Sequence, residues 1–168
     1  MTFLNEVIDA VRGAVGPERP LGIRFYDDLV DYSLVLEDYK QMVGTIEAAG
    51  KVDYFNMWQG LVASPRSGRE HWPSHYYKPG QFAHLPAGLK EATSLPVVGT
   101  GRIDSPALAN TMIADGKADI IGMARILIAD PHRPNNASEG RADDIRTCIA
   151  CTSGTSISEW ASAASTIP

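Results

Sequence analysis

Two glycine–arginine pairs follow two short apolar segments in the last third of the chain. The segment Pro96–Gly99 leads into Gly101 and Arg102, and the segment Asp119–Gly122 leads into Arg125. The length and the Val/Ile content of both segments predict β-strands. Glycine lets a ligand approach the backbone closely, and the planar guanidinium of arginine donates two parallel hydrogen bonds that suit phosphate. The spacing therefore indicates a phosphate site, with surface arginines after ordinary strand-to-helix turns as the alternative.

A helical pattern, Pro106–Asp115, separates these two predicted strands. Asp104 or Ser105 is expected to cap its N-terminus, and Gly116 is expected to end it. Helices that follow parallel strands point their N-termini, with free N–H groups and a partial positive charge, at the same end of the sheet. Paired phosphate-binding loops of this kind occur after the last two strands of a (β/α)8 barrel.

The rest of the chain also alternates between helical and strand patterns, and four helices with four strands predict an α/β fold with a parallel sheet and right-handed crossovers. A full TIM barrel needs about 250 residues, so four strands amount to half of one. Such an open sheet leaves apolar edges. The further segments are helices over Phe3–Val15, Ser33–Ala49 and Phe82–Thr93, strands over Leu21–Phe25 and Val52–Trp58, and a loop over Gly60–Gly80.

The composition and charge of the chain restrict the kinds of partner that it could bind and the cellular compartment in which it is expected. The chain has 168 residues and a formal net charge of −5, which argues against nucleic acid or an anionic membrane as the partner. The sequence contains no apolar run of membrane-spanning length, and Met1 leads into an amphipathic helix rather than a signal peptide. The two cysteines, Cys148 and Cys151, form no disulfide framework, so a reducing cytoplasm is the expected location.

Several segments resemble one known family: VVGTGRIDSP, ADIIGMARILIADP, EGRADDIRTCIAC and, more weakly, ISEW. They resemble the C-terminal half of the flavin barrel in the old yellow enzyme (NADH:flavin oxidoreductase) superfamily. Trimethylamine and dimethylamine dehydrogenases are the members most resembled, with 2,4-dienoyl-CoA reductase as a further relative. The resemblance implies a partial FMN-binding barrel over residues 1–147, a remnant of a cysteine-rich cluster segment in an irregular tail over 148–168, and hydride transfer between a substrate carbon and the flavin.

The resemblance also implies which residues meet the cofactor. Gly101, Arg102 and Arg125 would hold the FMN phosphate, and Gly122 and Ala124 would belong to the same cofactor site.

Three further residues are implied to contact the flavin ring or the substrate. Arg24 would lie near the flavin pyrimidine ring, where a cation stabilises the anionic reduced flavin. Trp58 and Trp160 match tryptophans of an aromatic bowl for an alkylammonium group, held by cation–π attraction of up to about 2 kcal/mol. Core packing for Trp58 and a stray tail aromatic for Trp160 are the alternatives. Gln59–Leu61 supplies no carboxylate where the family places an active-site acid, so the catalytic residues are not assigned.

Cys148 and Cys151 would begin the four-cysteine set that holds a [4Fe–4S] cluster in the family. This sequence has no third or fourth cysteine, which leaves the set incomplete. Zinc binding, thiol–disulfide exchange and a pair without a role are the alternatives. His71 and His75 have the spacing of a helical metal pair, but Pro73 between them argues against that helix and favours an aromatic loop over the barrel mouth.

Three functional hypotheses follow. The first is a flavin-dependent oxidoreductase acting on an amine or an enoyl substrate, completed by a second copy or another chain, with an electron-transfer flavoprotein as a candidate partner. The second is a phosphate-binding half-barrel without redox chemistry. The third is a partial chain that does not fold alone, because the first four strands of the barrel are expected to lie outside it.

Overall fold

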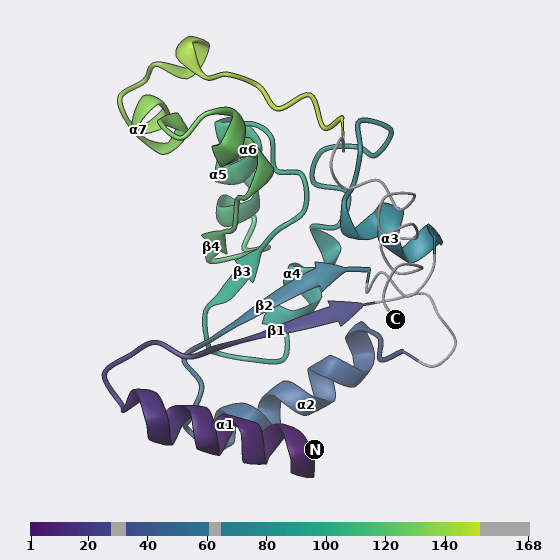
Figure 1. The fold of residues 1–168 in the computed structure, drawn as a ribbon, viewed down its shortest axis with the longest axis vertical. Coiled ribbons are helices and arrows are strands. Elements are labelled where there is room, and N and C mark those ends of the chain that lie inside the picture. The colour runs from purple at the N-terminus through teal and green to yellow at the C-terminus, as the bar shows by residue number, and fades with distance from the viewer. Residues whose placement is uncertain (28–32, 61–64, 152–168) are drawn as a thin grey trace, which may run out of the picture.

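A computed structural model describes residues 1–27, 33–60 and 65–151 of the chain (Figure 1). In the described part, none of the helices has the length and apolar character needed to cross a membrane. The elements in chain order are α1 (Thr2–Val15), β1 (Gly22–Asp27), α2 (Leu36–Ala48), β2 (Tyr54–Gln59), α3 (Pro65–His71), α4 (His84–Lys90), β3 (Val97–Gly99), α5 (Pro106–Ala114), β4 (Ile120–Ile121), α6 (Arg125–Ala129), α7 (Arg133–Ser138) and the 3-10 turn Ala142–Asp144.

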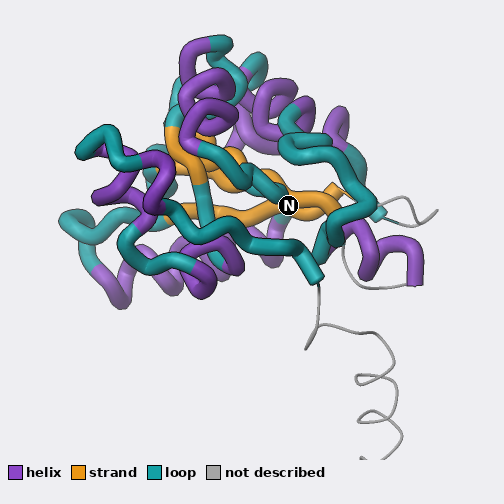
Figure 2. Tube along the Cα trace, turned by 90° about the horizontal axis from the view of Figure 1, so that it is seen from above, coloured by secondary structure: helices purple, strands orange, loops and turns teal. Residues whose placement is uncertain are grey.

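The four strands form one parallel sheet in the order β1-β2-β3-β4. Phe55 lies opposite Val97, and Val98 lies opposite Ile120, so each strand pairs with the next one along the chain. Figure 2 shows the strands running through the middle of the molecule with helices around them. The predicted parallel α/β sheet is therefore confirmed, and its strand order is that of one arc of a (β/α)8 barrel.

The two faces of the sheet carry different side chains because successive residues of a strand point to opposite sides. Phe25, Phe55 and Val97 are buried in the main hydrophobic core, which includes Val43 and Ile46 of α2. The alternate positions of β1 and β2, and Thr100 directly after β3, carry polar and aromatic residues that line a cavity: Arg24, Asn56, Trp58 and Thr100.

Two aspartates occupy equivalent places just before β2 and β4. Asp53 accepts hydrogen bonds from the backbone N–H of Leu21 (2.7 Å) and from the guanidinium of Arg12 (2.5 Å). Asp119 accepts from the ammonium of Lys90 (2.5 Å) and from the backbone N–H of Val97 (2.8 Å). The backbone N–H of Leu21, followed by Arg12, lowers the pKa of Asp53, and Lys90, followed by the N–H of Val97, lowers the pKa of Asp119.

The predicted loop Gly60–Gly80 is wrong over Pro65–His71, where α3 forms. Proline suits the first turn of a helix, and Pro73 disfavours helical geometry in the residue before it, so two prolines bracket one short helix. The predicted helix Phe82–Thr93 is shorter than expected, because α4 spans His84–Lys90. The predicted N-cap of α5 is Ser105, whose hydroxyl accepts from the N–H of Leu108 at 3.1 Å.

Large apolar side chains are exposed on the helices that precede β1 and follow β4. On α1, Phe3 is 77% exposed, and Val7, Val11 and Val15 share its spacing of four residues. On α6, Ile128 is 83% exposed, with Ile113 and Ile120 nearby in sequence. Within the described residues, β1 and β4 each pair on one side only, which is the open sheet that the sequence predicts.

Candidate functional site

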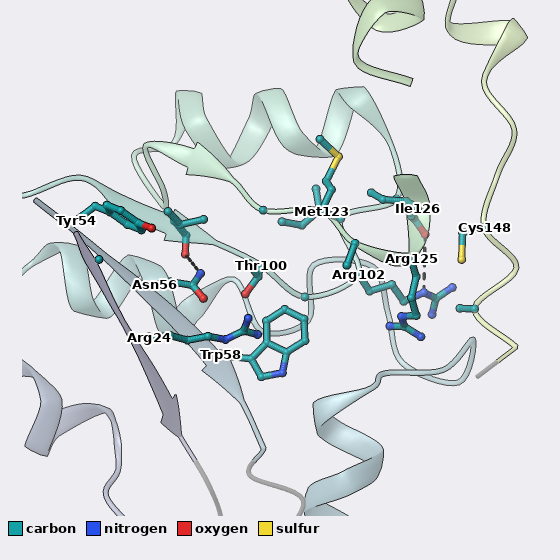
Figure 3. Close-up of a pocket in the computed structure, with 18 of the residues that line it drawn as sticks. Arg24, Tyr54, Asn56, Trp58, Thr100, Arg102, Met123, Arg125, Ile126 and Cys148 are labelled. Carbon is teal, nitrogen blue, oxygen red and sulfur yellow. Dashed lines mark hydrogen bonds and ion pairs between the residues drawn. The ribbon is translucent and has the colours of Figure 1, made fainter. Parts of the chain in front are cut away.

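A cavity of about 480 Å³ runs along the inner face of the sheet and ends at the loops after β3 and β4. Its volume lies in the range of small-molecule and cofactor sites, roughly 300–1,000 Å³. Figure 3 shows Arg24 and Trp58 in one part of it and Arg102, Arg125 and Cys148 in another. The structure brings most of the predicted site residues together on its wall: Arg24, Trp58, Gly101, Arg102, Gly122, Ala124, Arg125 and Cys148. Trp160 lies outside the described residues.

Arg125 carries an unused hydrogen-bond donor at the end of the cavity. Its Nη2 donates to the carbonyl of Pro73 at 3.0 Å, whereas its Nη1 is buried and has no partner among the described residues. Burial lowers the pKa of Arg125 from its ordinary value, while Cys148 opposes this shift and Arg102 adds to it. A buried donor without a partner costs about 1–3 kcal/mol and more when charged, and this atom lies where a ligand in the cavity could accept from it.

Arg102 donates hydrogen bonds to carbonyl groups of the protein itself. Its Nη1 donates to the carbonyl of Ser74 at 3.0 Å and also to the carbonyl of Tyr77, and its Nε lies 3.9 Å from a carboxylate oxygen of Asp104. Its own carbonyl accepts the N–H of Gly80 at 3.1 Å. Arg102 therefore fastens the loop between α3 and α4 to the strand end through Nη1, and it also adds positive charge to the cavity.

Glycine is required at two of the predicted positions for different reasons. Gly101 has a φ of 106°, a conformation that side-chain-bearing residues rarely adopt, and nothing lies closer than 3.6 Å to the position of an added Cβ. At Gly122, an added Cβ would lie 2.5 Å from the methyl carbon of Thr100 and 3.2 Å from Val98. Packing between β3 and β4 therefore accounts for Gly122, and its contact with a cofactor remains a prediction.

Arg24 lies in the cavity against aromatic rings. Its guanidinium carbon lies 4.5 Å from the ring centroid of Trp58 and 5.4 Å from that of Tyr26, within the range of cation–π attraction.

A buried carboxylate that sequence reasoning missed lies beside the end of β2. Glu70, on α3, is 8% exposed and accepts a hydrogen bond from the side chain of Gln59 at 3.0 Å. The residues directly after Trp58 contain no acid, but the fold supplies one from a helix that the sequence analysis assigned to a loop. The two prolines around α3 were the signal that could have located it.

Asp130 is a second residue that the sequence reasoning left without a role. It is 2% exposed, and its carboxylate accepts from the backbone N–H of His132 (3.0 Å) and from that of Arg146 (3.1 Å). The carbonyl of Ala150 accepts the N–H of His75 at 3.2 Å. These contacts hold the segment after the 3-10 turn and bring Cys148 to the cavity wall.

The cysteine pair does not fit a [4Fe–4S] cluster from this chain alone. Such a cluster is held by four thiolates, whereas the whole sequence contains two cysteines. Cys148 is half-buried and Cys151 is exposed. Across residues 1–27, 33–60 and 65–151, no group of three or more His, Cys, Asp or Glu side chains is placed to hold a metal ion.

Comparisons with known proteins agree with this arrangement. The chain is 38% identical to a metal reductase of Desulforamulus reducens, over 92% of the chain and 22% of that relative. It is 35% identical to the dimethylamine dehydrogenase of Hyphomicrobium sp., over 94% of the chain and 21% of that relative. Among solved structures, a 2-naphthoyl-CoA reductase in complex with 2-naphthoyl-CoA matches with a TM-score of 0.79 and 32% identity, over 91% of this chain and 23% of that one.

These relatives are much longer than the chain, which spans about a fifth of their length. Residues 1–144 match the NADH:flavin oxidoreductase / NADH oxidase family, and this match includes every strand and both glycine–arginine turns. A parallel sheet in chain order, a cationic cavity on its inner face and this match support one conclusion. The chain belongs to the NADH:flavin oxidoreductase / NADH oxidase family and is a partial barrel of the old yellow enzyme type.

Proposed function

We propose that the chain supplies the FMN-binding half of an oxidoreductase of the amine dehydrogenase type. The flavin would supply the two-electron chemistry, which is hydride transfer between it and a substrate carbon. The single observation that carries this proposal is the buried, unpartnered Nη1 of Arg125 at the end of the cavity. A phosphate there would accept this donor and neutralise a guanidinium that burial otherwise disfavours.

The other residues of the cavity have separate roles in this proposal. The backbone at Gly101 admits the phosphate, Arg102 adds charge beside Arg125, and the backbone of Gly122 and Ala124 borders the same site. Arg24 would face the pyrimidine part of the ring system. Trp58 and Trp160 as substrate contacts, and the cluster remnant over 148–168, remain predictions.

The barrel is completed, in this proposal, by further strands from another chain segment, a second copy or another chain. The exposed apolar side chains on the helices that precede β1 and follow β4, such as Phe3 and Ile128, support this part of the proposal because large exposed apolar residues mark surfaces that are covered in use. An electron-transfer flavoprotein would take the electrons, and the cytoplasm is the proposed location because no disulfide joins the two cysteines.

The test is reconstitution of the purified chain with FMN, followed by size-exclusion chromatography with absorption spectra across the folded peak. Co-elution of flavin with the chain supports the proposal, and Arg125→Ala should abolish it while Arg141→Ala, an exposed arginine paired with Glu139, should not. A folded peak that stays colourless with excess FMN contradicts the proposal and favours a phosphate-binding half-barrel without redox chemistry.

A further inference from the structure

The segment that carries Cys148 and Cys151 is held against the cavity. Cys148 lines the same end of the cavity as Arg125 (Figure 3). Ala150, directly before Cys151, is 3% exposed, and its carbonyl accepts the backbone N–H of His75 at 3.2 Å. Cys148 is half-buried, whereas Cys151 is exposed. The pair is therefore fixed to the cavity wall and can be reached from solvent at Cys151.

The backbone bends at Ala150, between the two cysteines. Its φ of 51° lies in the left-handed region, which residues with a Cβ rarely adopt. Such a conformation persists where the surroundings impose it, and it is concentrated at ligand clamps and switch regions. A Cys-x-x-Cys segment with a bend between its cysteines is suited to direct both sulfur atoms at one ion.

The donor set of the pair is too small for the common thiolate-bound metal groups. A [4Fe–4S] cluster needs four thiolates, and zinc in structural sites is almost always four-coordinate. The chain has two cysteines, and residues 152–168 contain no histidine or methionine. Among the residues that the structure describes, no third His, Cys, Asp or Glu side chain groups with the pair. The cysteines therefore offer two sulfur ligands and no imidazole to complete either group.

Two thiolates suit a soft cation with one positive charge. Thiolate ligands select soft ions such as Cu(I), and a closed-shell monovalent ion accepts two thiolates in a linear arrangement. The complex carries one net negative charge, because two thiolates outweigh one positive charge. A charge at a half-buried position needs a partner of opposite sign close to it.

Arg125 supplies that opposite charge. Burial lowers the pKa of Arg125, negative charge at Cys148 opposes this shift, Arg102 adds to it, and Cys151 again opposes it. The guanidinium and the two thiol groups are therefore close enough to interact electrostatically. Nη2 of Arg125 donates to the carbonyl of Pro73 at 3.0 Å, which fixes the guanidinium in this place. Attraction between charges needs no hydrogen bond, so Nη1 stays available to a ligand in the cavity.

We propose that Cys148 and Cys151 bind one monovalent soft metal ion, such as Cu(I), as a two-coordinate complex whose negative charge Arg125 compensates. The site lies beside the cavity of the proposed function, but the inference does not rest on that function. The two cysteines hold a single ion in a chain that lacks the ligands for a cluster.

The first test is a titration of the reduced full chain, without FMN, with Cu(I) under anaerobic conditions and in competition with a chromophoric Cu(I) chelator. We expect one ion per chain. Cys148→Ser and Cys151→Ser should each weaken binding more than about 100-fold, because loss of a ligand exceeds the usual effect of an outer-shell partner. Met123→Leu, which removes a thioether from the same cavity wall, is the matched control and should leave the affinity unchanged. Binding that survives in both cysteine variants, or an equal loss in Met123→Leu, would overturn the proposal.

X-ray absorption at the copper edge counts the ligands directly and needs no variant. We expect two sulfur atoms per copper, in a complex that elutes from size-exclusion chromatography at the same volume as the metal-free chain. Three or four sulfur atoms per copper, or a larger species after loading, would overturn the proposal and assign the cysteines to a site shared between two copies of the chain.

The same titration tests the role of Arg125. Arg125→Ala should weaken Cu(I) binding about 10-fold, and Arg125→Lys, which keeps the positive charge, should recover most of the loss. Arg141→Ala, at an exposed arginine paired with Glu139, should have no effect. Equal affinities of the wild-type chain and Arg125→Ala would overturn the compensation of charge by Arg125.

These outcomes are separate from those of the FMN reconstitution. A chain that binds Cu(I) through its cysteines but binds no FMN would remove the proposed function and leave this metal site intact. A chain that binds FMN but withholds no Cu(I) from the chelator would do the reverse.

Discussion

Charged side chains are paired at the amino ends of the parallel strands but not fully paired at the carboxyl ends. At the amino ends, Asp53 and Asp119 each meet one cation and one backbone N–H. At the carboxyl ends, Arg125 keeps a buried donor that has no partner among the described residues. The paired aspartates join a helix, a strand and a turn, whereas the arginine at the carboxyl ends leaves positive charge directed into a cavity.

This contrast separates stability from binding. Paired and partly exposed carboxylates such as these lower the free energy of the folded chain by a modest amount. Unpaired buried cations raise it, and they persist where a ligand supplies the missing charge. In (β/α)8 enzymes the carboxyl ends of the strands carry the chemistry and the amino ends serve stability, and the charge pairing of this half-barrel differs between its two ends in the same sense.

The largest expected effect is at the cavity end. Arg125→Ala should weaken FMN binding roughly 100-fold, on the order of 2–3 kcal/mol, because a charged donor to the phosphate is lost. Fluorescence titration of FMN measures this effect. Arg12→Ala, at the opposite end of the sheet, is the matched control and should lower the urea midpoint while leaving FMN affinity unchanged. Equal losses of FMN affinity in both variants would contradict the assignment of binding to the carboxyl ends and of stability to the amino ends.

A second prediction concerns packing at the carboxyl ends. Gly122→Ala should destabilise the chain by roughly 1–3 kcal/mol, because its methyl group would overlap the methyl of Thr100. Thr100→Ser removes that methyl but keeps the hydroxyl that donates to the Met57 carbonyl at 3.1 Å. In urea unfolding, the double variant should recover most of the loss. No recovery would show that Gly122 is needed for another reason, such as approach of a ligand.

At the amino ends, Asp119→Asn should cost about 0.5–1 kcal/mol, since the side chain is 38% exposed and solvent screens its pair with Lys90. Asp53→Asn should change stability in the same direction. Asp115→Asn, which alters an exposed pair with Lys117, serves as the control and should be close to neutral. Urea unfolding followed by circular dichroism compares the three variants. If Asp115→Asn lowered the free energy of unfolding as much as Asp119→Asn, the aspartates at the amino ends would contribute no more to stability than an ordinary surface pair.

The smallest effect is the pH dependence of stability. The pKa values of Asp53 and Asp119 are lowered in the folded chain. The stability that they contribute is therefore present above the unfolded value, about 4, and is lost as pH falls through the folded values. The urea midpoint should stay level from about pH 7 to 5 and decline below about 4. The double variant Asp53→Asn/Asp119→Asn should decline less steeply, and an identical decline would assign the acid sensitivity to other groups.

Much of the fold followed from local patterns. The apolar periods located α1 and α2 and all four strands, and Ser105 with Pro106 located the start of α5. The misassigned part was α3, because a seven-residue helix is too short for its apolar period to be read from the sequence. Its position decided two features of the site, since it brings Glu70 to Gln59 and His71 to the aromatic rings.

By itself the sequence determined that two glycine–arginine turns lie at the same end of a parallel sheet, because strand direction and the local turns are properties of short segments. It could not distinguish Arg102 from Arg125. The difference arises from carbonyls of the loop after α3, which are 25 to 52 residues away along the chain. Two of them accept from Nη1 of Arg102, and one accepts from Nη2 of Arg125, whose buried Nη1 has no partner among the described residues. Only the tertiary structure decided which arginine has a buried donor without a partner among the described residues, because hydrogen bonds between distant segments exist only once the chain has folded.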